Sequence, residues 1–385
     1  MVDRGPLAGL QVVELAGIGP GPYAAMLMAD MGADVISIER PVSSQTAKAA
    51  TDDLLRRSRR SVIVDLQQQR GATTVLSLVS KADVLIEGFR PGVAERLGLG
   101  PEDCWEANPR LVYGRMTGWG QSGPLAPSAG HDISYIAVTG ALGSIGQAGQ
   151  PPVPPVNLVG DFGGGSLFLV MGVLAALWEV QRSGLGQVVD AAIVDGTSSL
   201  LTLLHGLRAS GSWSDDRGTN LIDTGVPWYD TYQTADGEWM AVGALEQRFY
   251  SDFIRLLGLP DDMLRGRHDP SNWARMRLAI SERFATRSRA EWTAIFEGTD
   301  ACVAPVMSLS EAPLHPHLAS RETFIDVGGV TQPAPAPRFS RTPCATPEPP
   351  RRRGADTIEV LRGSGIGHID RLLSEGTVQG VSGSP

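Results

Sequence analysis

The feature that most constrains this fold is an alternation of short apolar runs with helix-like segments over the first 120 residues. The apolar runs are rich in β-branched residues and cover 10–16, 33–39, 61–66, 82–89 and 111–119. Helical spacing separates them, for example at 23–32 and at about 71–80. Strands that alternate with helices form a mostly parallel sheet that is covered on both faces. The sequence therefore predicts an α/β fold.

The pattern of expected secondary structure changes after about residue 210. The elements expected there are a hairpin around Ala-Asp-Gly and two further helices, at 228–245, 247–257 and 271–298. A proline-rich segment at 331–353 predicts an extended strap, and the helix-like pieces after it are expected to dock on the first domain. We therefore expect a large domain made of 1–210 and 330–385, and a small α+β domain at 211–329.

Composition excludes several classes of protein. A net charge of −9 argues against a general nucleic-acid binder. Three scattered cysteines, Cys104, Cys302 and Cys344, indicate a reduced protein with neither a disulfide framework nor a metal site. The start of the chain lacks a signal-peptide pattern, and the longest apolar stretch, 166–178, is too short to span a bilayer. We therefore expect a cytoplasmic protein without a membrane partner.

Two glycine-flanked turns carry the most reactive side chains. GHDISY at 130–135 contains His131, and NLVGDFGGG at 157–165 contains Asp161. An imidazole and a carboxylate on such turns suit two-base proton chemistry, because each can reach a substrate without backbone in the way. Gly163–Gly165 would let a substrate approach the start of the following apolar helix closely. Taken alone, however, DFGGG also fits a simple helix entry with Asp161 as its N-cap.

The region after the first two strands is rich in arginine. GIGPGP at 17–22 lies where a dinucleotide-binding loop would lie, but its glycines alternate and do not match that fingerprint. Arg40 directly follows Glu39 at the end of the second strand, and RRSRR occupies 56–60. Charge runs are usually solvated, yet together with Arg90 and Arg96 these arginines suit a nucleotide with several phosphates, such as coenzyme A.

These motifs, together with LAGLQVVELAGIGPGPYAAMLMADMGADVISIERP, DVLIEGFRPGVAERLGLG and MTGWGQSGP, resemble the α-methylacyl-CoA racemases of the class III CoA-transferase superfamily. The resemblance extends from about residue 6 to 345. It implies a Rossmann-like large domain, a small domain and an interlocked homodimer. GHDISY is its most specific part, because the racemase branch carries a histidine there.

The resemblance also implies roles for individual residues. His131 and Asp161 correspond to the catalytic bases, Glu246 to an acid near the histidine, and Asn157 to a residue that supports the site. The positions that correspond to CoA contacts are Arg40, Val64, Gly88, Phe89, Arg90, Arg96, Gly130, Asp132, Ile133, Ser134 and Tyr135. Within 56–60 the sequence departs from its relatives, so the arginine that meets a CoA phosphate is left open there. Asp132 also fits the cap of a turn.

Two functions share this set of residues. In a racemase, His131 and Asp161 would exchange protons with the two faces of a thioester enolate, without any cofactor besides the CoA of the substrate. Asp161 can donate a proton only if burial raises its pKa. In a CoA-transferase, Asp161 would instead attack the thioester and become an aspartyl-CoA thioester. His131 favours the racemase, because a transferase does not need it.

Overall fold

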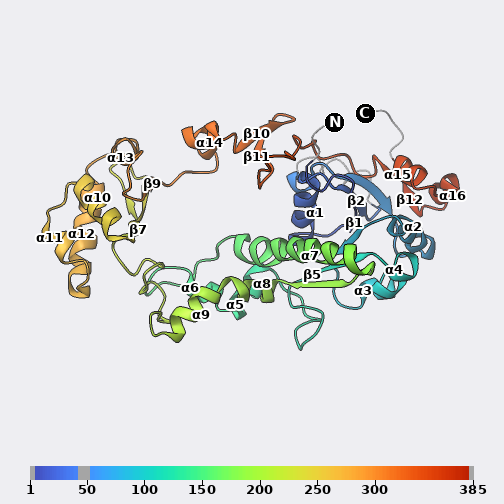
Figure 1. Ribbon diagram of the computed structural model, residues 1–385, viewed down its shortest axis with the longest axis horizontal. Coiled ribbons are helices and arrows are strands. Elements are labelled where there is room, and N and C mark those ends of the chain that lie inside the picture. Colours follow the sequence, from blue (N-terminus) through green and yellow to red (C-terminus); the bar gives the residue numbers. More distant parts are fainter. Residues whose placement is uncertain (1–4, 42–52, 381–385) are drawn as a thin grey trace. The chain divides into compact units, whose positions relative to one another are not determined.

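The computed structural model describes residues 5–41 and 53–380, and the chain divides into two units (Figure 1). The first unit contains Met1–Thr139, Val156–Leu200 and Ser320–Pro385, and the second contains Gly140–Pro155 and Leu201–Ala319. The boundaries expected from the sequence, at 210/211 and 329/330, lie about ten residues away from these. The short piece Gly140–Pro155 was not expected in the second unit, because its composition resembles an ordinary loop.

The first unit is built on a seven-stranded sheet with the order β12-β3-β2-β1-β4-β5-β6. Its strands are β1 (Gln11–Leu15), β2 (Asp34–Glu39), β3 (Arg60–Val64), β4 (Val84–Glu87), β5 (Val112–Thr117), β6 (Val188–Ala192) and β12 (Val378–Gln379). All neighbours pair in parallel except β12, which is antiparallel to β3. The predicted mostly parallel α/β sheet is confirmed. Its order reverses between β1 and β4, as in doubly wound folds.

Alternate residues of each strand supply two separate cores. Val13, Leu15 and their counterparts face one layer of helices, formed by α2 (Gln69–Val79), α4 (Pro101–Ala107), α15 (Thr357–Gly363) and α16 (Ile369–Ser374). Val12, Val35 and their counterparts face α1 (Pro20–Asp30) and α7 (Leu167–Ser183) on the other side. The two late helices α15 and α16 thus dock on the large sheet, as the sequence predicts.

The first helix starts earlier than its apolar pattern indicates. α1 begins at Pro20 directly after Gly19, whose φ of 70° turns the chain at the end of the strand loop. Proline suits the first position of a helix because its missing N–H has no partner there in any case. The helix expected over 23–32 therefore gains one turn at its start.

α7 extends a preceding helical stretch, η3 (Leu158–Ser166), into 26 continuous residues over Leu158–Ser183, of which an 18-residue window has a mean hydropathy of 1.7. By length and composition this is the one helix among residues 5–41 and 53–380 that reaches the requirement for crossing a membrane. The expectation that the apolar segment is too short is therefore wrong, because η3 lengthens it. Leu169 and Val173 of this helix pack into the core against Gly114 of β5.

Shorter elements complete the first unit. They are η2 (Leu54–Arg56), α3 (Val93–Arg96), α5 (Asp132–Val138), α8 (Ile193–Leu200) and the hairpin of β10 (Phe324–Val327) with β11 (Val330–Pro333). The segment that follows β11 is mostly without regular structure up to α15, as the proline content of 331–353 predicts.

The second unit contains an antiparallel sheet of order β7-β8-β9, with β7 (Tyr229–Gln233), β8 (Trp239–Gly243) and β9 (Val303–Pro305). The hairpin predicted around Ala-Asp-Gly is confirmed. The remaining elements are α6 (Ala141–Ser144), α9 (Thr202–Ala209), α10 (Gln247–Leu257), α11 (Asp262–Arg265), η4 (Pro270–Asn272), α12 (Trp273–Phe284), α13 (Arg289–Phe296), η5 (Ala312–Leu314) and α14 (Pro316–Ser320).

The helix expected over 271–298 is two helices. Ser288 caps α13 by accepting a hydrogen bond from the backbone N–H of Glu291, whose side chain accepts one from the Ser288 N–H in return. Such a capping box fixes a new helix start. Phe284 and Trp292, one from each helix, then pack edge to face at 5.3 Å in the aromatic core of this unit.

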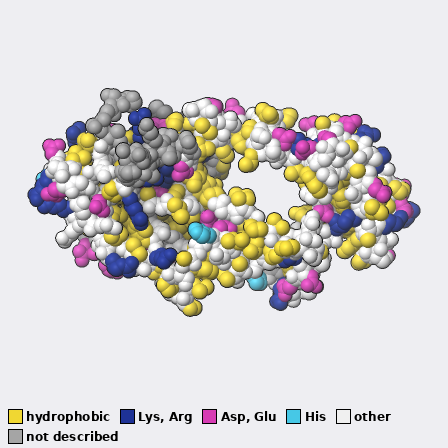
Figure 2. All heavy atoms as spheres, turned by 180° about the vertical axis from the view of Figure 1, so that it is seen from behind, with side chains coloured by type: hydrophobic (Ala, Val, Ile, Leu, Met, Phe, Trp, Pro, Cys, Tyr) yellow, Lys and Arg dark blue, Asp and Glu magenta, His cyan; other side chains and the backbone are white. Residues whose placement is uncertain are grey.

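On the face that Figure 2 shows, positive and negative side chains are mixed, and hydrophobic side chains also reach the surface. In the first unit, the large apolar side chains that are exposed include several that follow one another along α5, η3, α7 and α8. These are Ile133, Val138, Leu158, Leu167, Met171, Trp178 and Leu200. Large apolar side chains exposed on several elements of one unit mark a candidate contact surface.

Candidate active site

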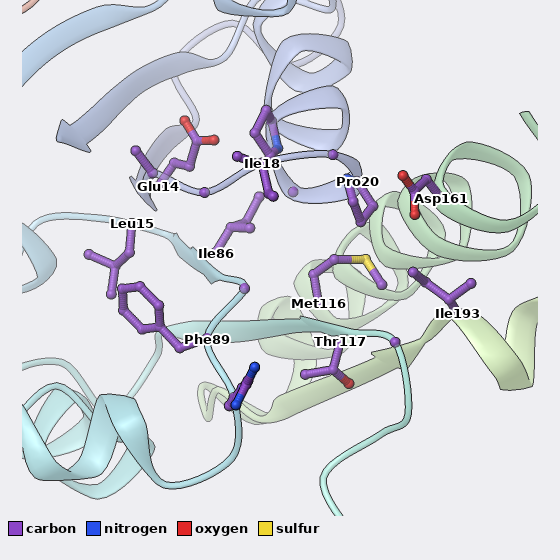
Figure 3. Close-up of a pocket in the computed structure, with 18 of the residues that line it drawn as sticks. Glu14, Leu15, Ile18, Pro20, Ile86, Phe89, Met116, Thr117, Asp161 and Ile193 are labelled. Atoms are coloured by element: carbon purple, nitrogen blue, oxygen red, sulfur yellow. The ribbon is translucent and has the colours of Figure 1, made fainter. Parts of the chain in front are cut away.

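A cavity of about 840 Å³ lies beyond the carboxyl ends of the parallel strands in the first unit. The loop Ala16–Gly19 after β1, the turn Gly88–Arg90 after β4 and Thr117–Trp119 at the end of β5 all line it. Ligands of doubly wound sheets bind at this edge, where the strand order reverses. In the view of Figure 3, Glu14 and Asp161 lie on opposite sides of the cavity.

Asp161 belongs to η3, in which the backbone widens to a π-helix. The N–H of Phe162 donates to the carbonyl of Asn157 five residues earlier, at 3.3 Å. Oδ2 of Asp161 accepts a hydrogen bond from Nδ2 of Asn157 at 3.4 Å, and it lies close enough to Gly19 that a Cβ there would be 3.2 Å away. π-Helical turns occur often at functional sites. Here the turn presents the carboxylate of Asp161 to the cavity, with Asn157 in contact with it.

The glycines of η3 pack against neighbouring elements of the protein. A Cβ on Gly164 would lie 2.4 Å from Oγ1 of Thr197, and one on Gly165 would lie 3.2 Å from Pro20 and from Met116. Gly163, Gly164 and Gly165 do not line the cavity. The expectation that these glycines admit a substrate is therefore wrong. They let η3 lie directly on α8, α1 and β5.

The protonation of Asp161 is set by its surroundings. Burial raises the pKa of its carboxyl above the ordinary aspartate value, the hydrogen bond from Asn157 lowers it, the neighbouring charge of Asp132 raises it, and His131 lowers it. Burial is the largest of these influences, and the net direction is upward. This upward direction is the one that proton donation by Asp161 would require.

His131 lies on a second turn that lines the same cavity, at the N-cap of α5, with extended backbone and an exposed side chain. Its neighbour Asp132 turns away from the cavity and is buried, with a relative exposure of 8%. Oδ1 of Asp132 accepts a hydrogen bond from the backbone N–H of Asp161 at 2.7 Å. The two turns that carry His131 and Asp161 are thus joined by a hydrogen bond.

Tyr135 forms part of the wall beside His131. Its ring lies where a Cβ on Gly118 or Gly130 would be, at 2.0 Å and 2.5 Å from the nearest ring atom. Trp119 packs edge to face on it at 4.8 Å between centroids. Both glycines are therefore required by the ring. Burial, followed by the charge of Asp161, raises the pKa of Tyr135, so its hydroxyl stays protonated at neutral pH.

The comparisons with known proteins fit this arrangement. Residues 7–357 match CoA-transferase family III. The chain belongs to this family. It is similar to α-methylacyl-CoA racemase of Mus musculus, with 44% identity over 95% of this chain and 97% of that protein. Succinyl-CoA:glutarate CoA-transferase of Mus musculus is 29% identical over 97% of this chain and 90% of its own. Among solved structures, a CAIB/BAIF family protein from Brucella suis is 26% identical, with a TM-score of 0.82 over 94% of this chain and 100% of its own.

Most of the predicted positions of this family III protein meet in the cavity. The lining includes His131 and Asp161 together with Arg40, Gly88, Phe89, Arg90, Gly130 and Tyr135. The predicted positions outside the lining are Val64, Arg96, Asp132, Ile133, Ser134 and Asn157. Val64 is fully buried in β3, with its side chain in the core, and Asp132 is occupied by Asp161. The ligand contacts expected at Val64 and Asp132 stay predictions.

Glu246 belongs to the second unit of the family III protein. It is the exposed N-cap of α10, and its carbonyl accepts a hydrogen bond from the N–H of Tyr250. Its predicted contact with His131 stays a prediction, because the two residues lie in different units.

The arginine run at 56–60 is not a solvated loop. Arg57 and Arg59 are almost completely buried, and they pair with Asp30 and Glu14 respectively. Arg56 pairs with Glu39 at 2.5 Å, while Arg60 pairs with Asp34 at the surface. Arg56 and Arg59 line the cavity, whereas Arg57 reaches Gln332 and the carbonyl of Pro333 in β11. The acids in three different strands and helices that pair with this run could not be identified from the run itself.

Two features of the cavity have no counterpart in the sequence prediction. Glu14 of β1 is 1% exposed and lines the cavity, and Arg353 from the proline-rich segment lines it as well. An acid inside the apolar run QVVEL is a signal that could have marked Glu14, since buried charges are rare in strands. No local pattern places Arg353, because its position depends on the docking of a segment about 290 residues after β3.

Among residues 5–41 and 53–380, no group of three or more His, Cys, Asp or Glu side chains is arranged to hold a metal ion. Cys104, Cys302 and Cys344 are all free thiols.

Proposed function

We propose that this protein is a racemase that interconverts the (R) and (S) forms of 2-methylacyl-CoA thioesters. The observation that carries the proposal is that His131 and Asp161, on two different turns, line one cavity. The 44% identity to a protein named α-methylacyl-CoA racemase over nearly the whole chain supports it. A proton-transfer enzyme of this kind needs two bases, and this cavity contains an imidazole and a carboxylate.

In one direction, His131 removes the proton from the α-carbon. The electrons of the C–H bond pass into a planar enolate, and the protonated carboxyl of Asp161 returns a proton to the opposite face. In the other direction the two residues exchange roles. Burial raises the pKa of Asp161, which keeps a larger share of its carboxyl protonated and able to donate. No further cofactor takes part in this scheme.

We further propose that the protein acts as an interlocked homodimer. The apolar residues exposed along α5, η3, α7 and α8 of the first unit support this, because a second copy of the chain would cover them. In the assembled dimer, Glu246 is proposed to accept a hydrogen bond from His131 and thereby to orient its imidazole. Sedimentation of the purified protein tests the dimer, and a monomer at micromolar concentration would contradict it.

The alternative is a CoA-transferase in which Asp161 attacks the thioester. A family member named as a CoA-transferase is also similar over nearly the whole chain, although at 29% identity. That reaction forms an acyl-aspartyl anhydride and then an aspartyl-CoA thioester. This reaction uses the carboxylate of Asp161 as the nucleophile and gives His131 no role.

The deciding experiment incubates one enantiomer of a 2-methylacyl-CoA with the protein in heavy water. Entry of deuterium at the α-carbon together with loss of optical purity is the expected result. His131→Ala should suppress exchange of one enantiomer more than the other, and Asp161→Asn should do the reverse, because each base serves one face. An adduct trapped on Asp161 by hydroxylamine, without any deuterium entry, would favour the transferase instead.

A further inference from the structure

The C-terminal segment around Arg353 is fixed to the edge of the large sheet. The backbone N–H of Ser61 in β3 donates to Oδ2 of Asp356 at 2.8 Å, and its carbonyl accepts from the N–H of Asp356 at 3.0 Å. Oγ of Ser61 accepts from the N–H of Gly354 at 2.8 Å. A Cβ on Gly354 would lie 2.9 Å from Ile63, so the segment lies directly on the strand. Arg353 therefore reaches the cavity from a well-anchored backbone.

One side of the Arg353 guanidinium is already occupied. Its Nε lies 3.1 Å from Oε2 of Glu39, a carboxylate with 4% exposure at the end of β2. The other oxygen, Oε1, contacts Arg56 at 2.5 Å and accepts a hydrogen bond from Oγ of Ser61 at 2.7 Å. Nε of Arg353 and Oε2 of Glu39 therefore form a charge contact without a hydrogen bond, and among residues 5–41 and 53–380 the two terminal nitrogens of Arg353 have no hydrogen-bond or ion-pair partner. Such a fork matches two oxygens of one phosphate group.

The charges around Arg353 favour an anion. Glu14 is neutralised by Arg59, and Glu39 has Arg56 and Arg353 as partners. Arg40 also lines the cavity and is exposed, and within residues 5–41 and 53–380 it has no ion-pair partner. A positive end of a cavity in a chain of net charge −9 attracts a negative ligand.

The positive end and the reacting end of the cavity lie over different strands. Glu39 ends β2 and Arg40 follows it, while Ile193 lines the cavity directly after β6. Asp161 lies on the β6 side, because η3 packs on α8 through the contact of Gly164 with Thr197. β2 and β6 are four strand spacings apart in the sheet, which corresponds to about 20 Å. A thioester bound at Asp161 would therefore place a distant part of its carrier near Arg353.

We infer that Arg353, together with Arg40, binds the 3′-phosphate at the nucleotide end of coenzyme A. Arg353 thus selects CoA thioesters over carriers that lack this phosphate. The inference rests on the proposed use of CoA thioesters, but it does not depend on the reaction that follows binding. It adds a positive end, supplied by the C-terminal segment, to a site whose reacting groups come from the first 200 residues.

The test compares free CoA with 3′-dephospho-CoA by titration calorimetry on the full chain. We expect the unchanged protein to bind CoA more tightly, and Arg353→Gln to lose about ten- to a hundredfold in affinity for CoA with little change for dephospho-CoA. Arg353→Lys should recover part of the difference, because it restores the charge without the fork. Arg352→Gln is the matched control, since Arg352 is exposed and does not line the cavity, and it should behave like the unchanged protein.

Two results would overturn the inference. One is that the unchanged protein binds CoA and dephospho-CoA with equal affinity. The other is that Arg353→Gln loses the same factor of affinity for both ligands. The outcome is separate from that of the proposed function. A protein that binds CoA through Arg353 but exchanges no α-proton would retain the phosphate site and lose the racemase assignment.

Discussion

Oδ1 of Asp132 accepts a hydrogen bond from the backbone N–H of Asp161 at 2.7 Å, and this bond joins the two turns that carry the proposed bases. Asp132 directly follows His131, so one short contact fixes the relative position of both turns. Gly160 permits it, because a Cβ there would lie 2.3 Å from the same oxygen. The second oxygen, Oδ2, is buried and has no hydrogen-bond partner among the described residues. Asp132 therefore acts on Asp161 both by position and by charge.

Substitution of Asp132 should separate these two effects. Asp132→Asn keeps an acceptor for the Asp161 N–H but removes the charge that raises the pKa of Asp161, so we expect the pH profile of kcat/KM to move to lower pH on the limb set by that carboxyl. Asp132→Ala also removes the acceptor, and we expect a larger loss of kcat than in Asp132→Asn. The measurement is α-proton exchange as a function of pH. An unchanged profile in Asp132→Asn would contradict the role of its charge.

Glu87 should make the stability of the protein depend on pH. Burial raises its pKa from the ordinary 4.5 to about 7, and its Oε2 accepts from the N–H of Phe89 at 2.6 Å in the turn that lines the cavity. Between these two pH values the folded protein holds a proton that the unfolded chain releases, so this group lowers stability as the pH rises. We expect the free energy of unfolding of Glu87→Gln relative to the unchanged protein to increase from pH 4.5 to 7, by at most roughly 3 kcal/mol.

Glu95 provides the control with the opposite sign. The net direction of its pKa is downward: burial acts to raise it, but this is outweighed by the hydrogen bond and the charge of Arg115 and by a backbone hydrogen bond. The stability it contributes is present above its ordinary pKa and is lost as the pH falls. Glu95→Gln should therefore become less stable relative to the unchanged protein as the pH rises. Denaturant titrations at several pH values measure both trends. A difference in unfolding free energy between Glu87→Gln and the unchanged protein that stays constant with pH would contradict the prediction for Glu87.

The contact between η3 and α8 should be sensitive to a single methyl group. In Gly164→Ala the new Cβ would lie 2.4 Å from Oγ1 and 2.7 Å from the backbone nitrogen of Thr197, so η3 must shift. Overpacking of this kind costs about 1–3 kcal/mol, and it would also displace Asp161 and lower kcat. Gly206→Ala in α9 is the control, because nothing lies within 4 Å of its Cβ position. It should be neutral or stabilise the protein by up to about 1 kcal/mol. Equal melting temperatures for both variants would contradict this account.

The parallel sheet was predictable because its strands lie buried on both faces and read as continuous apolar runs between helical segments. The place of three turns in the cavity lining was predictable for a related reason, because each follows or flanks an element whose end the sequence marks. These turns contain His131, Asp161 and Gly88–Arg90. The π-helical widening at Asp161 and the packing of its glycines were not predictable, since they depend on Thr197 and Pro20, which approach only in the folded chain.

Charge pairing was the other limit of sequence reasoning. Arg57 and Arg59 resemble a solvated run, and only the fold supplies Asp30 and Glu14 as their partners. Burying one member of such a pair without the other would cost several kcal/mol, so the arginines and the acids must be placed together. A pattern confined to 56–60 cannot contain that information.

The attachment of residues 354–357 to Ser61 and Ile63 also has a consequence for the order of events during synthesis of the chain. The ribosome completes every other residue that lines the cavity well before it reaches Arg353, because the remaining lining ends at Ile193. Arg40 and both proposed bases are made earlier, so Arg353 is the last residue of the lining to be added. The inferred phosphate contact of Arg353 is therefore complete only after the C-terminal segment has been made and has docked on β3.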